Sequence, residues 1–135
     1  MTPRIGAQPS LTLRRVSVAD EFEAGDILIV DWRDTFANEA NKRRPAVIVS
    51  RSELAGLETV LLVPIAGETS AKVRNAFVTL SPTAENGCTK TSYALAHLVT
   101  ATSVDRITEM PGTRIEPTQL AELRRQIAFC VDAYQ

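Results

Sequence analysis

The sequence predicts a mainly β domain, in which a small antiparallel sheet curls into a barrel and one amphipathic helix follows at the C-terminus. Three observations predict this class. Short runs rich in β-branched residues recur along the chain, short polar connections separate them, and helical periodicity is confined to the end of the chain. Five or six strands at such short intervals, closed by one helix, are typical of a small antiparallel sheet or barrel.

The first residues differ in character from the rest of the chain. Residues 1 to 22 open with prolines and few apolar side chains, which predicts a flexible leader, and LTLRRVSV within it favours an edge strand. Residues 23 to 135 are then expected to form a single domain, because a chain of 135 residues is long enough for one core. The first strand of this domain is GDILIVDW, opened by Gly25-Asp26.

Three further strands are predicted in the middle of the chain, at AVIVS (46–50), TVLLVPI (59–65) and NAFVTL (75–80). Proline cannot donate to a strand ladder, so Pro45 is expected to be the first residue of its strand. Asn86-Gly87 predicts a turn. TSYALAHLVTATSV (91–104) has many β-forming residues and favours one more strand.

The end of the chain predicts a helix that starts at Pro117, a residue suited to the first helical turn. Apolar residues then recur at helical spacing and share one face: Leu120, Leu123, Ile127, Val131 and Tyr134. Arg125, Gln126 and Asp132 lie away from that face, and Phe129 lies roughly opposite Leu120. Arg124 and Arg125 are expected to be solvated, and Cys130, at the edge of the apolar face, is expected in the core.

Composition narrows the possible functions. Fifteen basic residues face sixteen acidic ones, so bulk charge argues against a protein that coats nucleic acid. Two distant cysteines and one histidine are too few for a zinc site, and no cofactor is expected. The chain has no stretch long and apolar enough for a membrane span, and its start lacks a signal peptide, so we expect a cytoplasmic protein.

Positive charge is nevertheless concentrated at one point, where Lys42, Arg43 and Arg44 precede Pro45 and an unbroken apolar run. This placement holds Arg44 at the junction of a loop and a strand. The cluster is either a solvated strand entrance, with Arg44 paired to a nearby carboxylate, or an anion-binding site.

The order of these pieces resembles the MazF/PemK toxins of type II toxin–antitoxin systems. The resemblance rests on GDILIVDW, RRPAVIVS, VLLVPI, ENGCTKTSYAL and the terminal helix, and runs from about Gly25 to the C-terminus. It implies an SH3-like barrel with a C-terminal helix, assembled as a homodimer. It also implies a toxin that cuts single-stranded RNA, such as mRNA, at short sequences without a metal, and that a cognate antitoxin protein blocks.

The resemblance also implies roles for individual residues. Arg44 matches the arginine that the family uses at its active site, and a guanidinium can give two hydrogen bonds to one phosphate. Glu39 matches a loop glutamate near the scissile bond, although it is equally consistent with a solvated carboxylate. Lys42 and Arg43 are expected to contact RNA electrostatically. Lys90 is expected to do the same from the loop before the last long strand.

The chain departs from the family pattern in two places. Where members carry a threonine after the third strand, this chain has Ala66, so a hydroxyl for RNA is expected from Thr69 or Ser70. Later, His97 replaces an acidic residue. Because imidazole titrates near pH 6.5, His97 is either a proton-transfer group beside Arg44 or a histidine packed on an apolar strand. Strand alternation places it on the same face as Tyr93.

The sequence leaves two alternatives to the ribonuclease function open. A member of the same fold that has lost cleavage would bind an antitoxin or RNA, and the absent threonine favours it. A gyrase-poisoning toxin acts through a tryptophan near the C-terminus, whereas the only tryptophan here is Trp32. Phe129 either lies exposed by itself or marks the homodimer interface.

Overall fold

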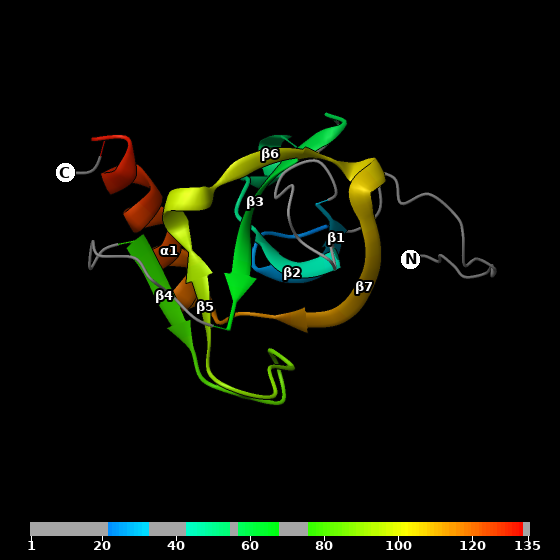
Figure 1. The fold of residues 1–135 in the computed structure, drawn as a ribbon. Helices are drawn as coiled ribbons and strands as arrows, with labels where there is room; N and C mark the ends of the chain where they lie inside the picture. The colour runs from blue at the N-terminus through cyan, green and yellow to red at the C-terminus, as the bar shows by residue number, and fades with distance from the viewer. Residues whose placement is uncertain (1–21, 33–42, 55–56, 68–75, 134–135) are drawn as a thin grey trace.

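The computed structural model describes residues 22–32, 43–54, 57–67 and 76–133 (Figure 1). Within them lie seven strands: β1 (Asp26–Asp31), β2 (Arg43–Ile48), β3 (Thr59–Ala66), β4 (Phe77–Leu80), β5 (Ser92–Leu95), β6 (Thr100–Ser103) and β7 (Ile107–Arg114). One α-helix, α1 (Pro117–Cys130), follows them, and three 3₁₀ turns lie between strands: η3 (Ser52–Leu54), η5 (Ala96–Leu98) and η6 (Val104–Arg106). The predicted class, mainly β with a C-terminal helix, is confirmed. The proposed leader strand LTLRRVSV lies outside the described residues.

The strands pair antiparallel in the order β4-β5-β3-β2-β1-β7, and β6 also pairs with β3. β6 runs along the first half of β3 and β5 along its second half, both on the side away from β2. From β6 the chain passes through η6 into β7, which pairs with β1 on the other side of the sheet. The sheet therefore curls round on itself, and Figure 1 shows β6 and β7 as the arc that closes it.

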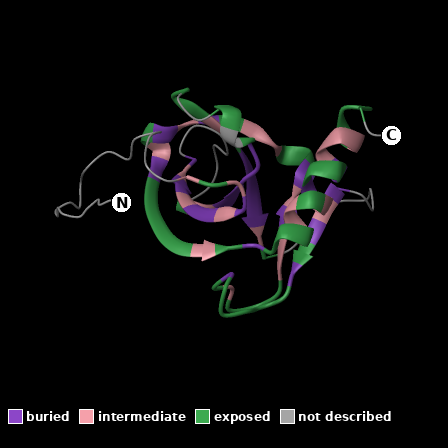
Figure 2. Cartoon of the chain, turned by 180° about the vertical axis from the view of Figure 1, so that it is seen from behind, coloured by how far each residue is buried: buried purple, intermediate pink, exposed green. Residues whose placement is uncertain are grey.

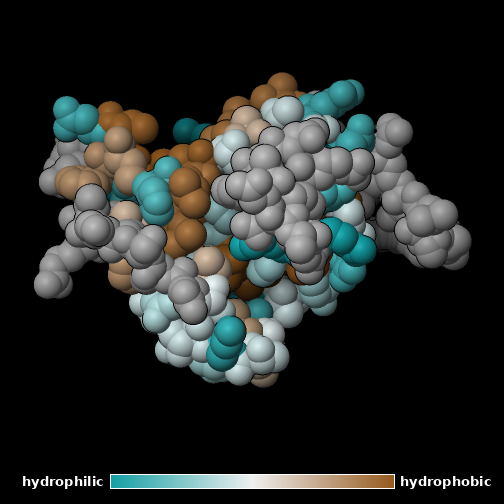
Figure 3. All heavy atoms as spheres, viewed as in Figure 1, coloured by the Kyte–Doolittle hydropathy of each residue, from teal (hydrophilic) through white to brown (hydrophobic). Residues whose placement is uncertain are grey.

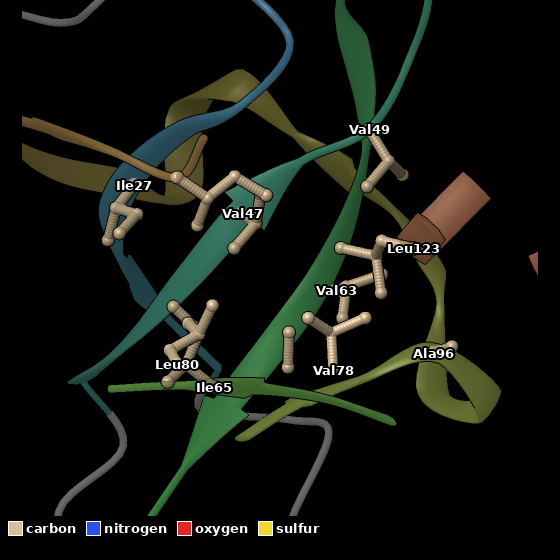
Figure 4. Packing of buried hydrophobic residues seen from close by; sticks show 11 residues of the cluster. Ile27, Val47, Val49, Val63, Ile65, Val78, Leu80, Ala96 and Leu123 are labelled. Carbon is tan, nitrogen blue, oxygen red and sulfur yellow. The ribbon is translucent and has the colours of Figure 1, made fainter. Parts of the chain in front are cut away.

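Both faces of the central strands are buried, which explains the unbroken apolar run after Pro45. Val47 and Val63 belong to a cluster that α1 helps to cover, and Figure 4 shows Leu123 pointing into it from the helix. Ala46 and Leu62, on the other face, belong to a second cluster with the fully buried Trp32. A strand covered on both faces has no polar side to alternate with, so its sequence is continuously hydrophobic.

Pro45 does not begin its strand, contrary to expectation. It is the third residue of β2 and pairs with Ile29 of β1. Pairing between β2 and β3 starts only at Ala46, which pairs with Pro64. At Pro45, β2 is therefore paired with β1 but not with β3. The missing N–H of proline removes no hydrogen bond between β2 and β3.

α1 begins at Pro117, as predicted. A capping box closes its first turn, because the backbone N–H of Glu116 donates to Oε1 of Gln119 at 3.0 Å and the Glu116 side chain accepts in return. Leu123 is fully buried, and Leu120 and Ile127 are half-buried against the same cluster. No helix in the described ranges is long and apolar enough to cross a membrane.

The far end of α1 differs from the sequence prediction. The helix ends at Cys130, so Val131 is 65% exposed instead of extending the apolar face, and Tyr134 lies outside the described residues. Gln126, expected to lie away from the core, is buried, and its Nε2 donates to Glu122 at 2.9 Å. Cys130, expected in the core, is exposed.

Arg124 connects the helix to the sheet, although it was expected to be a solvated residue. Its Nε donates to the carbonyl of Val49 at 3.1 Å, and another guanidinium nitrogen donates to the carbonyl of Ser50 at 3.3 Å. These carbonyls follow the last residue of β2, so the helix is tied to the strand that carries Arg44 at its other end.

Residues 91–104 do not form one strand. Leu62 and Ile65 are three residues apart on β3, but their partners Thr100 and Ala94 are six residues apart. The surplus of three residues is taken up by η5, which splits the predicted strand into β5 and β6. β7 was not predicted from the sequence, because its segment ITEMPGTR contains Pro111 and Gly112 and is exposed over most of its length (Figure 2).

Candidate functional site

The two arginines at the start of β2 face opposite sides of the sheet. Arg44 pairs in register with Val30, and strand alternation gives it the same face as Ala46, which belongs to the cluster around Trp32. Arg43 has the face of Val47, in the cluster that α1 covers. Arg44 is half-buried and Arg43 is exposed. A pair of adjacent arginines therefore presents positive charge on both sides of the unpaired edge of β2.

Arg43 makes an ion pair with Glu109 of β7, in which the nitrogen and oxygen are 2.8 Å apart. The two side chains are 53% and 57% exposed, so the pair contributes little to stability and mainly orients the guanidinium. Glu109 pairs in register with Ile29. The role of this carboxylate was not predicted from the sequence, because its strand has no β-like hydrophobic pattern.

Ala66 lies at the end of β3, on the side of the sheet toward which Arg44 also points. The register that pairs Ala46 with Pro64 places Ala66 across from Arg44 if it is continued two residues. Alternation from Leu62 gives Ala66 the face of Arg44. The position next to Arg44 thus offers a methyl group and no hydroxyl.

Lys90 extends toward the end of β3. A Cβ atom built on Gly67 would lie 3.1 Å from Cε and 3.3 Å from Nζ of Lys90, so the ammonium group lies beside the backbone of Gly67. Gly67 directly follows β3. The loop that carries Lys90 therefore places a cation at the same end of the sheet as the two arginines.

His97 does not lie on a strand. It is the middle residue of η5 and is exposed, so the strand alternation that assigned it to the face of Tyr93 does not apply, and it is not packed on an apolar strand either. η5 connects β5 to β6 along the side of β3 that faces away from β2. Two strand spacings, about 10 Å, thus separate its backbone from that of β2. Within one chain the structure does not bring His97 and Arg44 together.

Four predicted site residues, Glu39, Lys42, Thr69 and Ser70, lie outside the described residues. Their roles in catalysis and RNA binding stay predictions. In the described ranges no cluster of three or more His, Cys, Asp or Glu residues is arranged to hold a metal ion.

The turn predicted at Asn86-Gly87 is confirmed, and the side chain of Asn86 organises it. Its Oδ1 accepts from the backbone N–H groups of Thr83 at 3.1 Å and Cys88 at 2.8 Å, and its Nδ2 donates to the carbonyl of Ser81 at 2.8 Å. Gly87 has φ of +68°, a left-handed conformation that favours glycine. The hairpin between β4 and β5 is joined to β7 by a separate hydrogen bond, in which the backbone N–H of Arg114 donates to the carbonyl of Glu85 at 2.9 Å.

Asp26, in the motif that opens β1, has a structural role. Its Oδ2 accepts from the backbone N–H of Glu23 at 3.0 Å, and its Oδ1 lies 3.3 Å from a guanidinium nitrogen of Arg114. Burial raises the pKa of Asp26, and this outweighs the opposing effects of the Glu23 N–H and of Arg114. The interactions join the start of β1 to the end of β7.

Phe129 is half-buried near the end of α1. It is therefore not the fully exposed aromatic that helical periodicity suggested. Whether it belongs to an interface between two copies stays a prediction.

The family model of PemK-like, MazF-like toxins of type II toxin–antitoxin systems matches residues 23–131. Among solved structures, the Mycobacterium tuberculosis toxin MazF-mt6 is similar, with a TM-score of 0.63 and 21% identity over 82% of this chain and 99% of that chain. MazF from Deinococcus radiodurans has a TM-score of 0.62 and 20% identity, over 82% of this chain and 96% of its own.

An endoribonuclease from a mycobacterial species, solved in complex with its cognate antitoxin, has a TM-score of 0.62 and 15% identity, over 83% of this chain and 96% of that one. At these identities the structural likeness shows a MazF-like fold. A search of curated proteins found no match.

Proposed function

Because the chain belongs to the PemK-like, MazF-like toxin family of type II toxin–antitoxin systems, we propose that it cuts single-stranded RNA as the toxin component of such a pair. The observation that carries this proposal, beyond family membership, is Arg44. It is held by strand pairing at the start of β2, where it can face a phosphate group.

The proposed chemistry needs no metal ion. The ribose 2′-hydroxyl attacks the adjacent phosphorus, the bond to the 5′-oxygen of the next nucleotide breaks, and a 2′,3′-cyclic phosphate remains. The guanidinium of Arg44 stabilises the negative charge that develops on the phosphorane oxygens. Glu39 is the proposed group that takes the hydroxyl proton, and the departing 5′-oxygen takes a proton from water to leave as a 5′-hydroxyl. DNA has no 2′-hydroxyl, so the reaction is specific for RNA.

The test is cleavage of a long RNA by the purified protein. Excess chelator should leave the rate unchanged, and Arg44→Ala should lower the rate by about 10²-fold or more, as for other groups that stabilise transition-state charge. Arg51→Ala is the matched control, because Arg51 is exposed and pairs with Glu53 in η3, at the opposite end of β2. If Arg44→Ala cuts as fast as the parent, Arg44 is not part of the site.

A second function, binding without cleavage, is favoured by Ala66. This residue leaves the position across from Arg44 without a hydroxyl, and His97 lies on the far side of β3. Such a protein binds RNA or an antitoxin but leaves RNA intact. A gel-shift measurement with the same RNA distinguishes the two functions, because binding without product in the cleavage assay identifies the inactive form.

The proposed partners follow from the family. Structures of MazF from Deinococcus radiodurans and of the mycobacterial endoribonuclease include antitoxin chains, and we extend that partnership to this chain. We also propose a homodimer that acts on mRNA in the cytoplasm. Co-expression with the protein encoded by a neighbouring reading frame, followed by co-purification, tests the first of these.

A further inference from the structure

We propose that the recess between the β4–β5 hairpin and the outer face of β1 and β2 binds one unstacked nucleobase of the RNA strand. The proposal rests on the function proposed above and adds a subsite to it. It concerns the face of β2 that carries Arg43, not the face that carries Arg44.

The recess is a cavity of about 300 Å³ with an apolar floor. The floor is formed by Ile27, Ile29, Pro45 and Ile65. Ile27 and Ile65 also belong to the core cluster that α1 helps to cover, so the recess lies at an uncovered end of that cluster. In Figure 3, brown atoms lie deep between the hairpin at the bottom of the view and the body above it. Its volume is at the lower end of the range for small-molecule pockets, roughly 300–1,000 Å³, which suits a single base.

The rim of the recess is polar. Thr89, Ser92 and Thr113 line it, and Thr89 is exposed. The hydroxyl of Ser92 donates to the carbonyl of Lys90 at 3.0 Å, which leaves its oxygen able to accept a hydrogen bond. An apolar floor with hydroxyl groups at the edge suits a base, because the faces of a base are apolar and its edges carry hydrogen-bond donors and acceptors.

Two cations flank the recess. Arg43 lies on the same face of β2 as Pro45, two residues or about 6–7 Å along the strand, and its ion pair with Glu109 orients the guanidinium there. The ammonium of Lys90 lies beside Gly67, which follows Ile65 by two residues. A base seated between these cations has its flanking phosphates within their reach. This charge pattern favours RNA over a neutral or basic peptide as the occupant.

Cys88 lines the recess and is a free cysteine, so a ligand bound in the recess should slow the alkylation of its thiol. The chain has two cysteines, so Cys130→Ser leaves Cys88 as the single thiol. The experiment measures the rate of Cys88 alkylation by iodoacetamide in the presence of AMP, GMP, CMP or UMP. Ribose 5-phosphate is the matched control, because it keeps the sugar and phosphate but lacks the base.

At least one nucleotide should slow alkylation several-fold at saturation, while ribose 5-phosphate should not. Arg43→Gln or Lys90→Gln should raise the half-protecting concentration by about two- to fivefold, the range for an exposed ion pair, and Arg51→Gln should leave it unchanged. Each variant must alkylate at the parental rate without ligand, which shows that the recess is intact.

The proposal is overturned if all four nucleotides protect Cys88 no better than ribose 5-phosphate. It is also overturned if both charge variants leave protection unchanged. Arg44→Ala, made in the same background, separates this test from the proposed function. The variant should lose RNA cleavage and keep nucleotide protection, because Arg44 faces the other side of β2.

Discussion

The backbone of Gly87 lies close to the side chain of Thr113, which leads to a quantitative prediction for stability. A Cβ atom on Gly87 would lie 2.8 Å from Cγ2 of Thr113, a distance that a Cβ atom and a non-bonded carbon essentially never show, so one of them must shift. Thr113 is β-branched and stiff about χ1, so its methyl group cannot easily move aside. Gly87→Ala thus adds two costs: an L-residue at φ of +68°, and a collision that pushes the hairpin away from β7.

The two costs can be separated with a matched variant. Gly112 also has a positive φ, +87°, but a Cβ atom at this position would meet no other atom within 4 Å. Gly112→Ala should therefore cost only the left-handed strain, about 1–2 kcal/mol. Gly87→Ala should cost that amount plus about 1–3 kcal/mol for overpacking. The expected total for Gly87→Ala is about 2–5 kcal/mol in the free energy of unfolding.

Thr113→Ser, which deletes the colliding methyl group, completes a double-mutant cycle. Urea denaturation of the parent, both single variants and the double variant gives the coupling energy. Gly87→Ala should be substantially less destabilising in the Thr113→Ser background, since only the strain remains. The reasoning is refuted if Gly87→Ala costs no more than Gly112→Ala, or if Thr113→Ser gives no relief.

Three further predictions concern the site, the interface and pH. His97→Ala should lower RNA cleavage less than tenfold, because His97 lies across β3 from β2, whereas a proton-transfer role predicts a loss of about 10²–10⁴-fold. Phe129→Glu should shift the protein from dimer to monomer in analytical ultracentrifugation while circular dichroism shows an intact helix; a parent that is already monomeric contradicts the dimer. Hydrogen bonds from Arg125 and Gln126 lower the pKa of Glu122 from 4.5 to about 2, so its contribution to stability is present above pH 4.5 and is lost as the pH falls toward 2. Glu122→Gln should remove this part of the acid dependence, and an unchanged pH–stability curve would contradict it.

Local sequence patterns were sufficient for much of the fold. The run Ala46–Val49 predicted a buried strand because burial on both faces leaves no polar position, and Pro117 marked the start of α1. β7 left no comparable pattern, because it is exposed and contains Pro111 and Gly112. The break at η5 was hidden for another reason: β-forming residues continue through it, and only the pairing with β3 reveals the surplus.

Side-chain partners were less predictable than strands, because they join segments far apart in the sequence. Nothing local indicated that Arg124 would reach the carbonyl of Val49, or that Glu109 would hold Arg43. Gln126 was expected away from the apolar face because glutamine is polar, but its side chain is buried and its amide donates to Glu122. The apolar run after Arg44 predicted the strand but not its first residue, because β2 starts at Arg43, two residues before Pro45.

The three surplus residues at η5 also affect how this chain is aligned with its relatives. β5 and β6 each keep their own register with β3, so the length of the connection can change during evolution without disturbing either ladder. For a relative whose connection differs in length, an ungapped alignment from Tyr93 to Thr100 would equate residues that pair with different positions of β3. Thr100 should instead be aligned with the residue of a homologue that pairs with the position of Leu62 on β3. The equivalent of a functional residue in β6 is thus found from its partner on β3.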